Sequence, residues 1–243
     1  FIDNLQLADN ELKYDNGGLD FARKPELNTD HLHVSNLQLQ LDGFSMKDDI
    51  YAGTIKKLTA TEQCGLEIKQ LETQFSYSDT AINISNLIFT TPSSAIMGNA
   101  SVRYESLAKI STDIGQLGLS IHMNPIRLAP ADMRFFSSFT GNDETLRKLT
   151  SKQILLEADA EGKVSDLLIE KLRLQIDKIT LSANGKTQGL PDANQLVANI
   201  NLDEFSGTIK SLSGLLPAGS IPPTLAANES FNVNGKLSAN KGN

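Results

Sequence analysis

The side chains that could bind a metal ion are few and scattered in this sequence. His31 and His33 would share one face of an extended segment, and neutral imidazole is a common zinc ligand. The third histidine, His122, lies far away along the chain, and no other ligand is evident near the pair. We therefore expect His31 and His33 to lie at a solvated strand edge.

Three acidic residues resemble the first half of a calcium-binding loop. Glu157, Asp159 and Glu161 alternate along the chain and are followed by Gly162, but Leu168 stands where such a loop carries its closing bidentate glutamate. Leucine supplies no oxygen ligand, so the match fails. Alternation predicts instead that the three carboxylates form the water-facing side of a strand.

The residues that could act as nucleophiles lack the neighbours that would activate them. Cys64 is the only cysteine, which excludes an intrachain disulfide and a cysteine-based zinc site, and we expect it to be a small buried residue. No serine lies in a Gly-x-Ser-x-Gly sequence, and no glycine-rich phosphate motif is present. We expect no enzymatic activity and no cofactor.

Composition excludes further classes of function. The 243 residues carry a formal net charge of -7, which argues against general binding of nucleic acid. No apolar run reaches the roughly 18 to 20 residues that a spanning helix needs. The chain opens on Phe1 inside a strand pattern, without an initiator Met or a signal peptide, so we expect a piece of a longer protein.

The sequence repeats one short motif several times, which we call the phrase. In Ile84-Ser85-Asn86-Leu87-Ile88-Phe89, an aliphatic residue, two polar residues and a second aliphatic residue precede a further alternating pair. Alternation gives a strand one apolar face, and the extra polar residue shifts the alternation as a β-bulge would. Related phrases begin at Ile2, Val34, Ile55, Ile68, Ile169 and Ile176. The phrase predicts kinked amphipathic strands.

Short polar turns between these segments predict an antiparallel meander. We expect a hairpin turn at Asp9-Asn10, a strand end at Asp42-Gly43 and short helices over residues 129–139, 143–149 and 208–216. The predicted fold is mainly β: a long, antiparallel, twisted and folded-over β-sheet with a few short helices. We expect two continuous segments, residues 1–110 and residues 111–243, the second carrying the inserted helices.

The apolar face leaves two interpretations open. In a closed sandwich it would be the core, which composition alone favours. If the strands instead line an open trough, a long apolar surface stays exposed, and such surfaces bind ligands or partners.

Nearly the whole chain resembles the periplasmic part of the TamB family, the translocation and assembly module proteins of the AsmA-like superfamily, in the form found in Bacteroidota. The order of several short stretches carries the resemblance. These are the recurring phrase, the Gly65-Leu66 strand, residues 86–91 followed by Pro92-Ser93-Ser94, residues 128–136, Gly189-Leu190-Pro191-Asp192, residues 212–217, Ile221-Pro222-Pro223 and Asn234-Gly235-Lys236-Leu237.

The resemblance implies a β-groove that conducts phospholipids between the inner and outer membranes, with acyl chains in the trough. It also implies a periplasmic location in a Gram-negative bacterium, an inner-membrane anchor, and contact with a BamA-type outer-membrane barrel through regions outside this sequence. The alternative is a scaffold for assembly of outer-membrane β-barrels and autotransporters. The lining residues that we expect are Leu37, Leu39, Ile82, Ile84, Leu87, Leu172, Leu174, Ile176, Ile179 and Leu181.

One modification signal stands apart from the strands. Asp79-Thr80-Ala81 at a turn resembles the O-glycosylation acceptor of periplasmic Bacteroidota proteins. It predicts Thr80 as a candidate O-glycosylation site.

Overall fold

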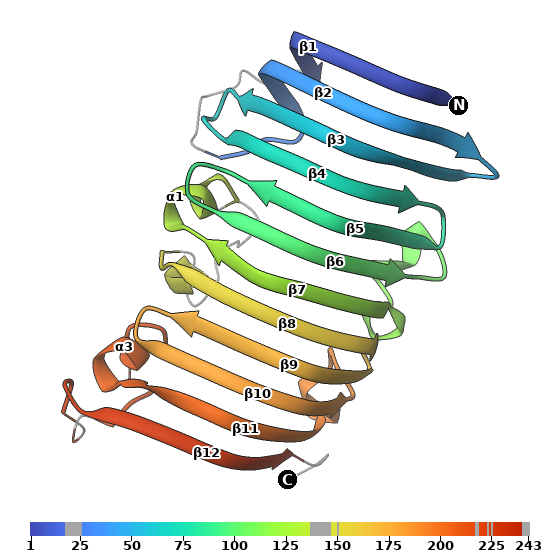
Figure 1. The fold of residues 1–243 in the computed structure, drawn as a ribbon. Helices are drawn as coiled ribbons and strands as arrows, with labels where there is room; N and C mark the ends of the chain where they lie inside the picture. Colours follow the sequence, from blue (N-terminus) through green and yellow to red (C-terminus); the bar gives the residue numbers. More distant parts are fainter. Residues whose placement is uncertain are drawn as a thin grey trace.

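The computed structural model describes residues 1–17, 26–136, 147–149, 151–216, 219–222, 224 and 226–239. Twelve strands form one antiparallel sheet whose spatial order is the order of the chain (Figure 1). This confirms the predicted mainly β fold. The strands are β1 (Ile2–Asp15), β2 (His31–Lys47), β3 (Ile50–Glu62), β4 (Glu67–Tyr77), β5 (Ala81–Thr90), β6 (Ala95–Arg103), β7 (Gly118–Leu128), β8 (Ile154–Lys163), β9 (Asp166–Ile176), β10 (Ile179–Gln188), β11 (Val197–Thr208) and β12 (Ser230–Ala239).

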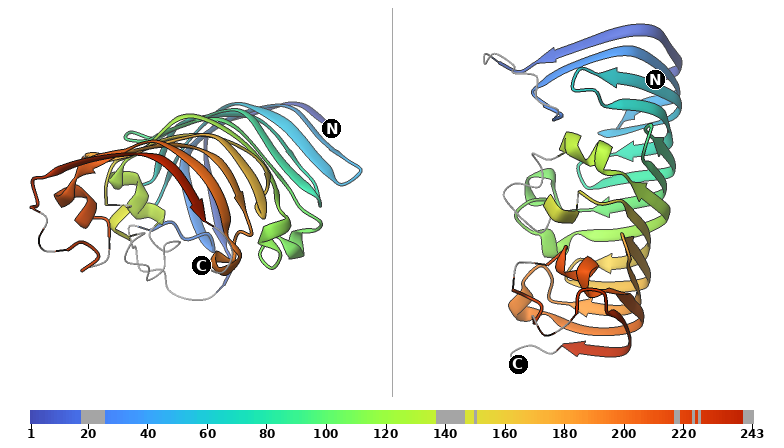
Figure 2. Two further views of the ribbon diagram at one scale, coloured as in Figure 1. Left: turned by 90° about the horizontal axis from the view of Figure 1, so that it is seen from below. Right: turned by 90° about the vertical axis from the view of Figure 1, so that its left-hand side faces the viewer.

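The sheet is twisted, curved and open. Figure 2 shows the strands stacked side by side along the molecule, with the short helices and longer connections on the concave side. The accessible surface of 14892 Å² is about 40% above the roughly 10,600 Å² that a compact monomer of this mass exposes. A second sheet, which a closed sandwich requires, is absent among the described residues.

The helices are short. They are α1 (Pro130–Met133), α3 (Ile209–Ser213) and the 3₁₀ turns η1 (Leu107–Lys109), η2 (Ile114–Gln116) and η4 (Ala193–Gln195). α1 and α3 lie inside the predicted ranges 129–139 and 208–216 but are shorter. Residues 137–139 of the first range and residues 143–146 of the predicted helix 143–149 lie outside the described residues. No helix in the described part of the chain has the length and apolar character needed to cross a membrane.

The recurring phrase produces β-bulges, as predicted, in most of its copies. Strand pairing shifts register between the two aliphatic residues of the phrases that begin at Val34, Ile55, Ile68, Ile84 and Ile169. In two copies the bulge is built on an asparagine with positive φ: Asn36 at 52° and Asn86 at 54°. Asparagine tolerates this left-handed conformation better than most residues. The Asn86 N–H, which the bulge leaves outside the ladder, donates to Asn99 Oδ1 at 2.8 Å.

Two predicted turns and one predicted bulge were wrong. Asp9-Asn10 is no hairpin turn: β1 runs through it and pairs with β2 on both sides, with Asp9 at positive φ in a bulge. Asp42-Gly43 does not end β2, because Gly43 also lies at a register shift and the strand continues to Lys47. Asp177-Lys178, which we predicted to be a bulge, is a two-residue hairpin turn, since Ile176 pairs with Ile179.

The sheet continues across the predicted boundary between residues 110 and 111. β6 and β7 pair directly there, for example through Ala100 and Ile121. The division into two segments stays a prediction.

Candidate functional site

All ten predicted lining residues lie on one face of the sheet, which we call the apolar face. Residues that pair directly across an antiparallel sheet point to the same side, and residues two apart along a strand do as well. In β9 this gives Leu167 and Ile169 before the bulge and Leu172, Leu174 and Ile176 after it. These five are half-buried or buried, while the other residues of β9 are exposed.

Two long rows of paired residues cross the apolar face. The first, the Leu172 row, runs through Leu87, Gly98, Met123, Ala158, Leu172, Ala183, Leu202 and Gly235. The second, the Ile84 row, runs through Phe75, Ile84, Ala100, Ile121, Ala160, Ile169, Gly185, Ile200 and Leu237.

Large and small residues alternate from strand to strand in both rows. β6, β8 and β10 contribute glycine or alanine, while β7, β9 and β11 contribute leucine, isoleucine or methionine. Side chains converge on the concave side of a curved sheet, and alternating sizes fit that taper, as they do inside small barrels. We infer that the apolar face is the concave one.

Near the β9–β10 turn, the side chains of the apolar face are all large and are more deeply buried. Leu174 pairs with Leu156 and Leu181, and Leu181 pairs with Phe205. Next to them Ile176 and Ile179 pair with each other and are only 4% and 6% exposed. These contacts bring together Leu174, Ile176, Ile179 and Leu181 of the predicted set.

The other predicted residues are spread along the face. Leu39 belongs to a third row of paired residues, and Leu37 lies next to it in β2 beyond the Val34 bulge. Ile82 pairs with Val102, and Leu87 and Leu172 belong to one row with three strands between them. The third row runs through Leu7, Leu39, Leu58, Leu71, Phe89 and Ile96. The predicted residues therefore form no compact pocket but mark positions along one surface.

A small polar anchor holds α1 against the strand ends. Asp132 is buried and accepts hydrogen bonds from Thr91 Oγ1 at 2.5 Å and Ser94 Oγ at 2.6 Å. Phe135, which follows α1, is 2% exposed, and its carbonyl oxygen accepts a hydrogen bond from Leu27 N–H at 2.7 Å. α1 is thus held at the strand ends, beside the β5–β6 turn.

The opposite face of the sheet is polar and rich in ion pairs. Glu157, from the sequence that resembles half a calcium loop, pairs with Lys171 at 2.5 Å, and this contact lowers the pKa of Glu157. Asp159 contacts His122, and Glu161 is exposed. The three carboxylates alternate along β8 on the polar face, as predicted.

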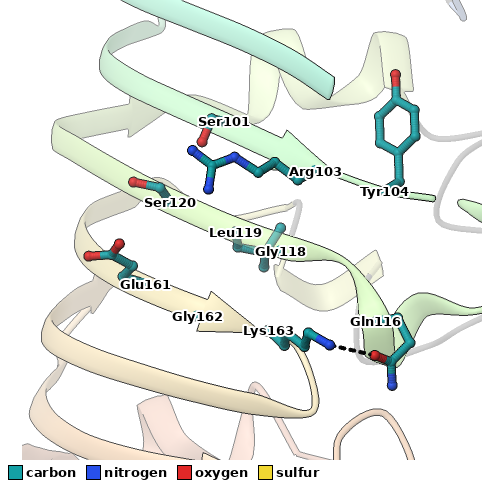
Figure 3. Close-up of a pocket in the computed structure, with 10 residues that line it drawn as sticks. All are labelled: Ser101, Arg103, Tyr104, Gln116, Gly118, Leu119, Ser120, Glu161, Gly162 and Lys163. Carbon is teal, nitrogen blue, oxygen red and sulfur yellow. Dashed lines mark hydrogen bonds between the residues drawn. The ribbon is translucent and has the colours of Figure 1, made fainter. Parts of the chain in front are cut away.

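A depression of about 490 Å³ lies on β6, β7 and β8 where they meet η2 (Figure 3). Arg103, Ser120 and Glu161 line it, and Lys163 donates to Gln116 Oε1 at 2.8 Å. This lining contains neither a histidine nor a cysteine, and a single carboxylate. Ser120 of β7 pairs directly with Glu161 of β8 in this lining, so a hydroxyl and a carboxylate lie on neighbouring strands.

The two clustered histidines are held by carboxylates of the neighbouring strand. His31 Nδ1 lies 3.0 Å from Asp15 Oδ1, and His33 Nε2 contacts Glu11 Oε1. Within the described residues, no three His, Cys, Asp or Glu side chains lie together in a group that could hold a metal ion. The pair fastens β2 to the edge strand β1.

Cys64 lies in the β3–β4 turn and is half-buried. Burial, followed by the neighbouring Glu62, raises the pKa of its thiol to about 11. A thiol with this pKa is protonated at neutral pH and is a poor nucleophile.

Thr80 is exposed in the β4–β5 turn. Its carbonyl oxygen accepts a hydrogen bond from Tyr104 N–H at 2.9 Å, and the Tyr104 hydroxyl donates to Ser78 O at 2.7 Å. Thr80 therefore lies on a fixed turn that an enzyme could reach, and its glycosylation stays a prediction.

The ten predicted lining residues come from β2, β5, β9 and β10 alone, so sequence reasoning missed the contributions of the other strands to the apolar face. Strict alternation in Leu119-Ser120-Ile121-His122-Met123 would have placed Ile121 and Met123 of β7 on that face. Alanine and glycine carry little hydrophobic signal, so Ala158 and Ala160 were passed over although they lie on the same face.

The chain was also compared with known proteins. It matches no family model, no curated protein and no solved structure.

Proposed function

We propose that the apolar face is an open trough that binds the acyl chains of phospholipids and lets them move along it between two membranes. The observation that carries this proposal is a single curved sheet whose apolar face runs over all twelve strands without a covering second layer in the described part of the chain. Most of its side chains are half-buried, so a ligand can still remove them from water.

The energetics favour movement over trapping. Each buried CH₂ group contributes about 0.8 kcal/mol, so a continuous trough offsets the loss of the bilayer for an acyl chain. Row after row offers similar leucine, isoleucine and alanine contacts, so a lipid gains little by stopping at one row. The polar face, with its ion pairs, stays in water.

The location and the partner belong to the same proposal. We place the protein in the periplasm as part of an inner-membrane-anchored chain, with a BamA-type outer-membrane barrel as partner through regions outside this sequence. These elements are part of the proposal and rest on the resemblance.

A second candidate is a scaffold for strands of outer-membrane client proteins. It is favoured by the two edge strands, β1 and β12, each of which pairs on one side only. Val233 and Leu237 of β12 are 48% and 55% exposed, so a strand added there would extend the apolar face.

The test of the trough replaces Ile84 and Leu174 by aspartate. Both lie on the apolar face, and a charge there raises the cost of placing an acyl chain beside it. We expect photo-crosslinked or copurifying phospholipid to fall at least several-fold, as measured by native mass spectrometry. The circular dichroism spectrum should keep its β-sheet shape.

The matched control carries aspartate at Ser85 and Gln175, the next residues of the same strands on the polar face. It adds the same charge and should retain lipid like the unmodified protein. Equal lipid retention by both double variants, with both folded, would exclude the trough. Client strands bound by a protein that holds no lipid would favour the scaffold.

A further inference from the structure

One pocket at the edge of the apolar face concentrates positive charge in a chain with a net charge of -7. Its volume is about 540 Å³, and it is lined by residues of α3 and of the β9–β10 turn. Both segments lie at the left-hand ends of the strands in Figure 1. Three lysines line it, each from a different segment: Lys152 before β8, Lys178 in the β9–β10 turn and Lys210 in α3. Asp177 is the single acidic residue of the lining, so the pocket carries a net charge of about +2 at neutral pH.

Asp177 is the only acidic residue that lines this pocket with the three lysines. Among the residues that the structure describes, none of Lys152, Lys178 and Lys210 forms an ion pair, whereas Lys171 and Lys186 on the polar face of the sheet do. An excess of positive charge in one pocket costs free energy through like-charge repulsion. An anionic ligand would remove that cost.

Neutral hydrogen-bonding groups complete the lining. Thr208, Ser211 and Asn228 add two hydroxyl groups and an amide. Thr208 Oγ1 accepts a hydrogen bond from Ser211 N–H at 3.2 Å, and the Ser211 hydroxyl lies 3.0 Å from it, which fixes both side chains. Lysines together with hydroxyl and amide groups suit a tetrahedral oxyanion, which offers several acceptor oxygens.

The pocket adjoins the most deeply buried part of the apolar face. Asp177 and Lys178 lie between Ile176 and Ile179 in sequence, and those two side chains are 4% and 6% exposed. Leu215 also lines the pocket. A molecule with a charged end and an apolar end could therefore occupy both regions together.

We propose that Lys152, Lys178 and Lys210 bind a phosphate group, and that its source is the headgroup of a phospholipid whose chains lie on the apolar face. This assignment of the source rests on the proposed function; free inorganic phosphate has the same chemistry and is tested separately. The trough would then select anionic over neutral lipids at this edge.

The experiment uses the full chain with dioleoyl phosphatidic acid and dioleoylglycerol, which differ by the phosphate alone. The variant carries Lys152→Gln, Lys178→Gln and Lys210→Gln. The control carries Lys56→Gln, Lys57→Gln and Lys236→Gln, which removes the same charge from exposed positions outside the pocket. Native mass spectrometry should show that the pocket variant retains at least about tenfold less phosphatidic acid than the unmodified protein and the control variant do. The reason is that the pocket variant has lost three charged hydrogen-bond donors to the phosphate, and each of them contributes to the binding free energy.

Dioleoylglycerol should be retained equally by all three proteins. Retention of phosphatidic acid by the pocket variant at the level of the control variant would overturn the proposal, as would an equal loss of both lipids from the pocket variant.

A result in which no protein retains either lipid would reject the proposed trough but not by itself the pocket. The effect of inorganic phosphate on the thermal midpoint then decides whether the pocket binds phosphate. A phosphate-dependent rise of the thermal midpoint in the unmodified and control proteins, absent from the pocket variant, supports a phosphate site for a free anion. No rise in the unmodified protein overturns the site.

Discussion

At the scale of single residues, the surroundings of Cys64 suppress the reactivity of its thiol. Glu62 is buried and accepts hydrogen bonds from the backbone N–H groups of His33 at 3.1 Å and Cys64 at 2.6 Å. Burial acts to raise the pKa of Glu62, but the hydrogen bonds outweigh it and the pKa is lowered. A charged carboxylate is thereby held beside the only thiol.

This arrangement predicts slow alkylation of Cys64. With a pKa of about 11 instead of the ordinary 9.0, the thiolate fraction at pH 8 falls about 100-fold. The rate with iodoacetamide, followed by intact mass, should be about tenfold lower in the native than in the unfolded protein, because a thiolate of higher pKa is also more nucleophilic and this offsets part of the loss. As pH rises, the native rate should keep increasing toward pH 11, whereas the unfolded rate levels off above pH 9.0.

The Glu62→Gln variant provides the control, since it removes the charge but keeps an acceptor oxygen. Alkylation at pH 8 should become faster. Equal native rates before and after this change would show that the carboxylate does not hold the thiol protonated.

At the scale of elements, the bulges explain what could be predicted and what could not. Polar pairs between aliphatic residues marked the kinks at Ser35-Asn36 and Ser85-Asn86. The same pattern at Asp177-Lys178 is a hairpin turn, and the turn-like Asp9-Asn10 is a bulge. Aspartate and asparagine at positive φ suit both structures, and the choice depends on which strand pairs with which.

Asn86 provides the prediction for this scale. Its φ of 54° suits asparagine and glycine, whereas a residue with an ordinary Cβ loses about 1 kcal/mol there. Asn86→Ala should lower the free energy of unfolding by about 1 kcal/mol in urea titrations, and Asn86→Gly should cost less. Equal losses in the two variants would indicate that the asparagine side chain, and not the backbone conformation, stabilises the bulge.

At the scale of the whole molecule, the sequence predicted the meander because consecutive strands pair in chain order. It did not predict how the curvature is accommodated. That depends on the cross-strand register, which places Gly98, Ala158 and Ala183 between larger neighbours in the Leu172 row. Small residues gain this role only from what faces them across strands, so no segment read alone reveals it.

The distinction between an open trough and a sealed core rests on those small residues. In a sealed core, enlarging Ala158 to phenylalanine would force neighbours apart and cost about 1 to 3 kcal/mol. On an open concave face the new ring can lie over Met123 and Leu172, its partners in the row. We therefore expect Ala158→Phe to change the free energy of unfolding by less than about 1 kcal/mol, measured by urea titration.

The same variant should retain less phospholipid, because the ring occupies space that acyl chains would use while adding no charge. Ser120→Phe, on the exposed polar face of β7, adds an equal ring elsewhere and should leave lipid retention unchanged. A loss of stability above 1 kcal/mol for Ala158→Phe, with Ser120→Phe unaffected, would show a packed interior and contradict the trough. Unchanged stability together with unchanged lipid retention would show that acyl chains do not occupy this face at β8.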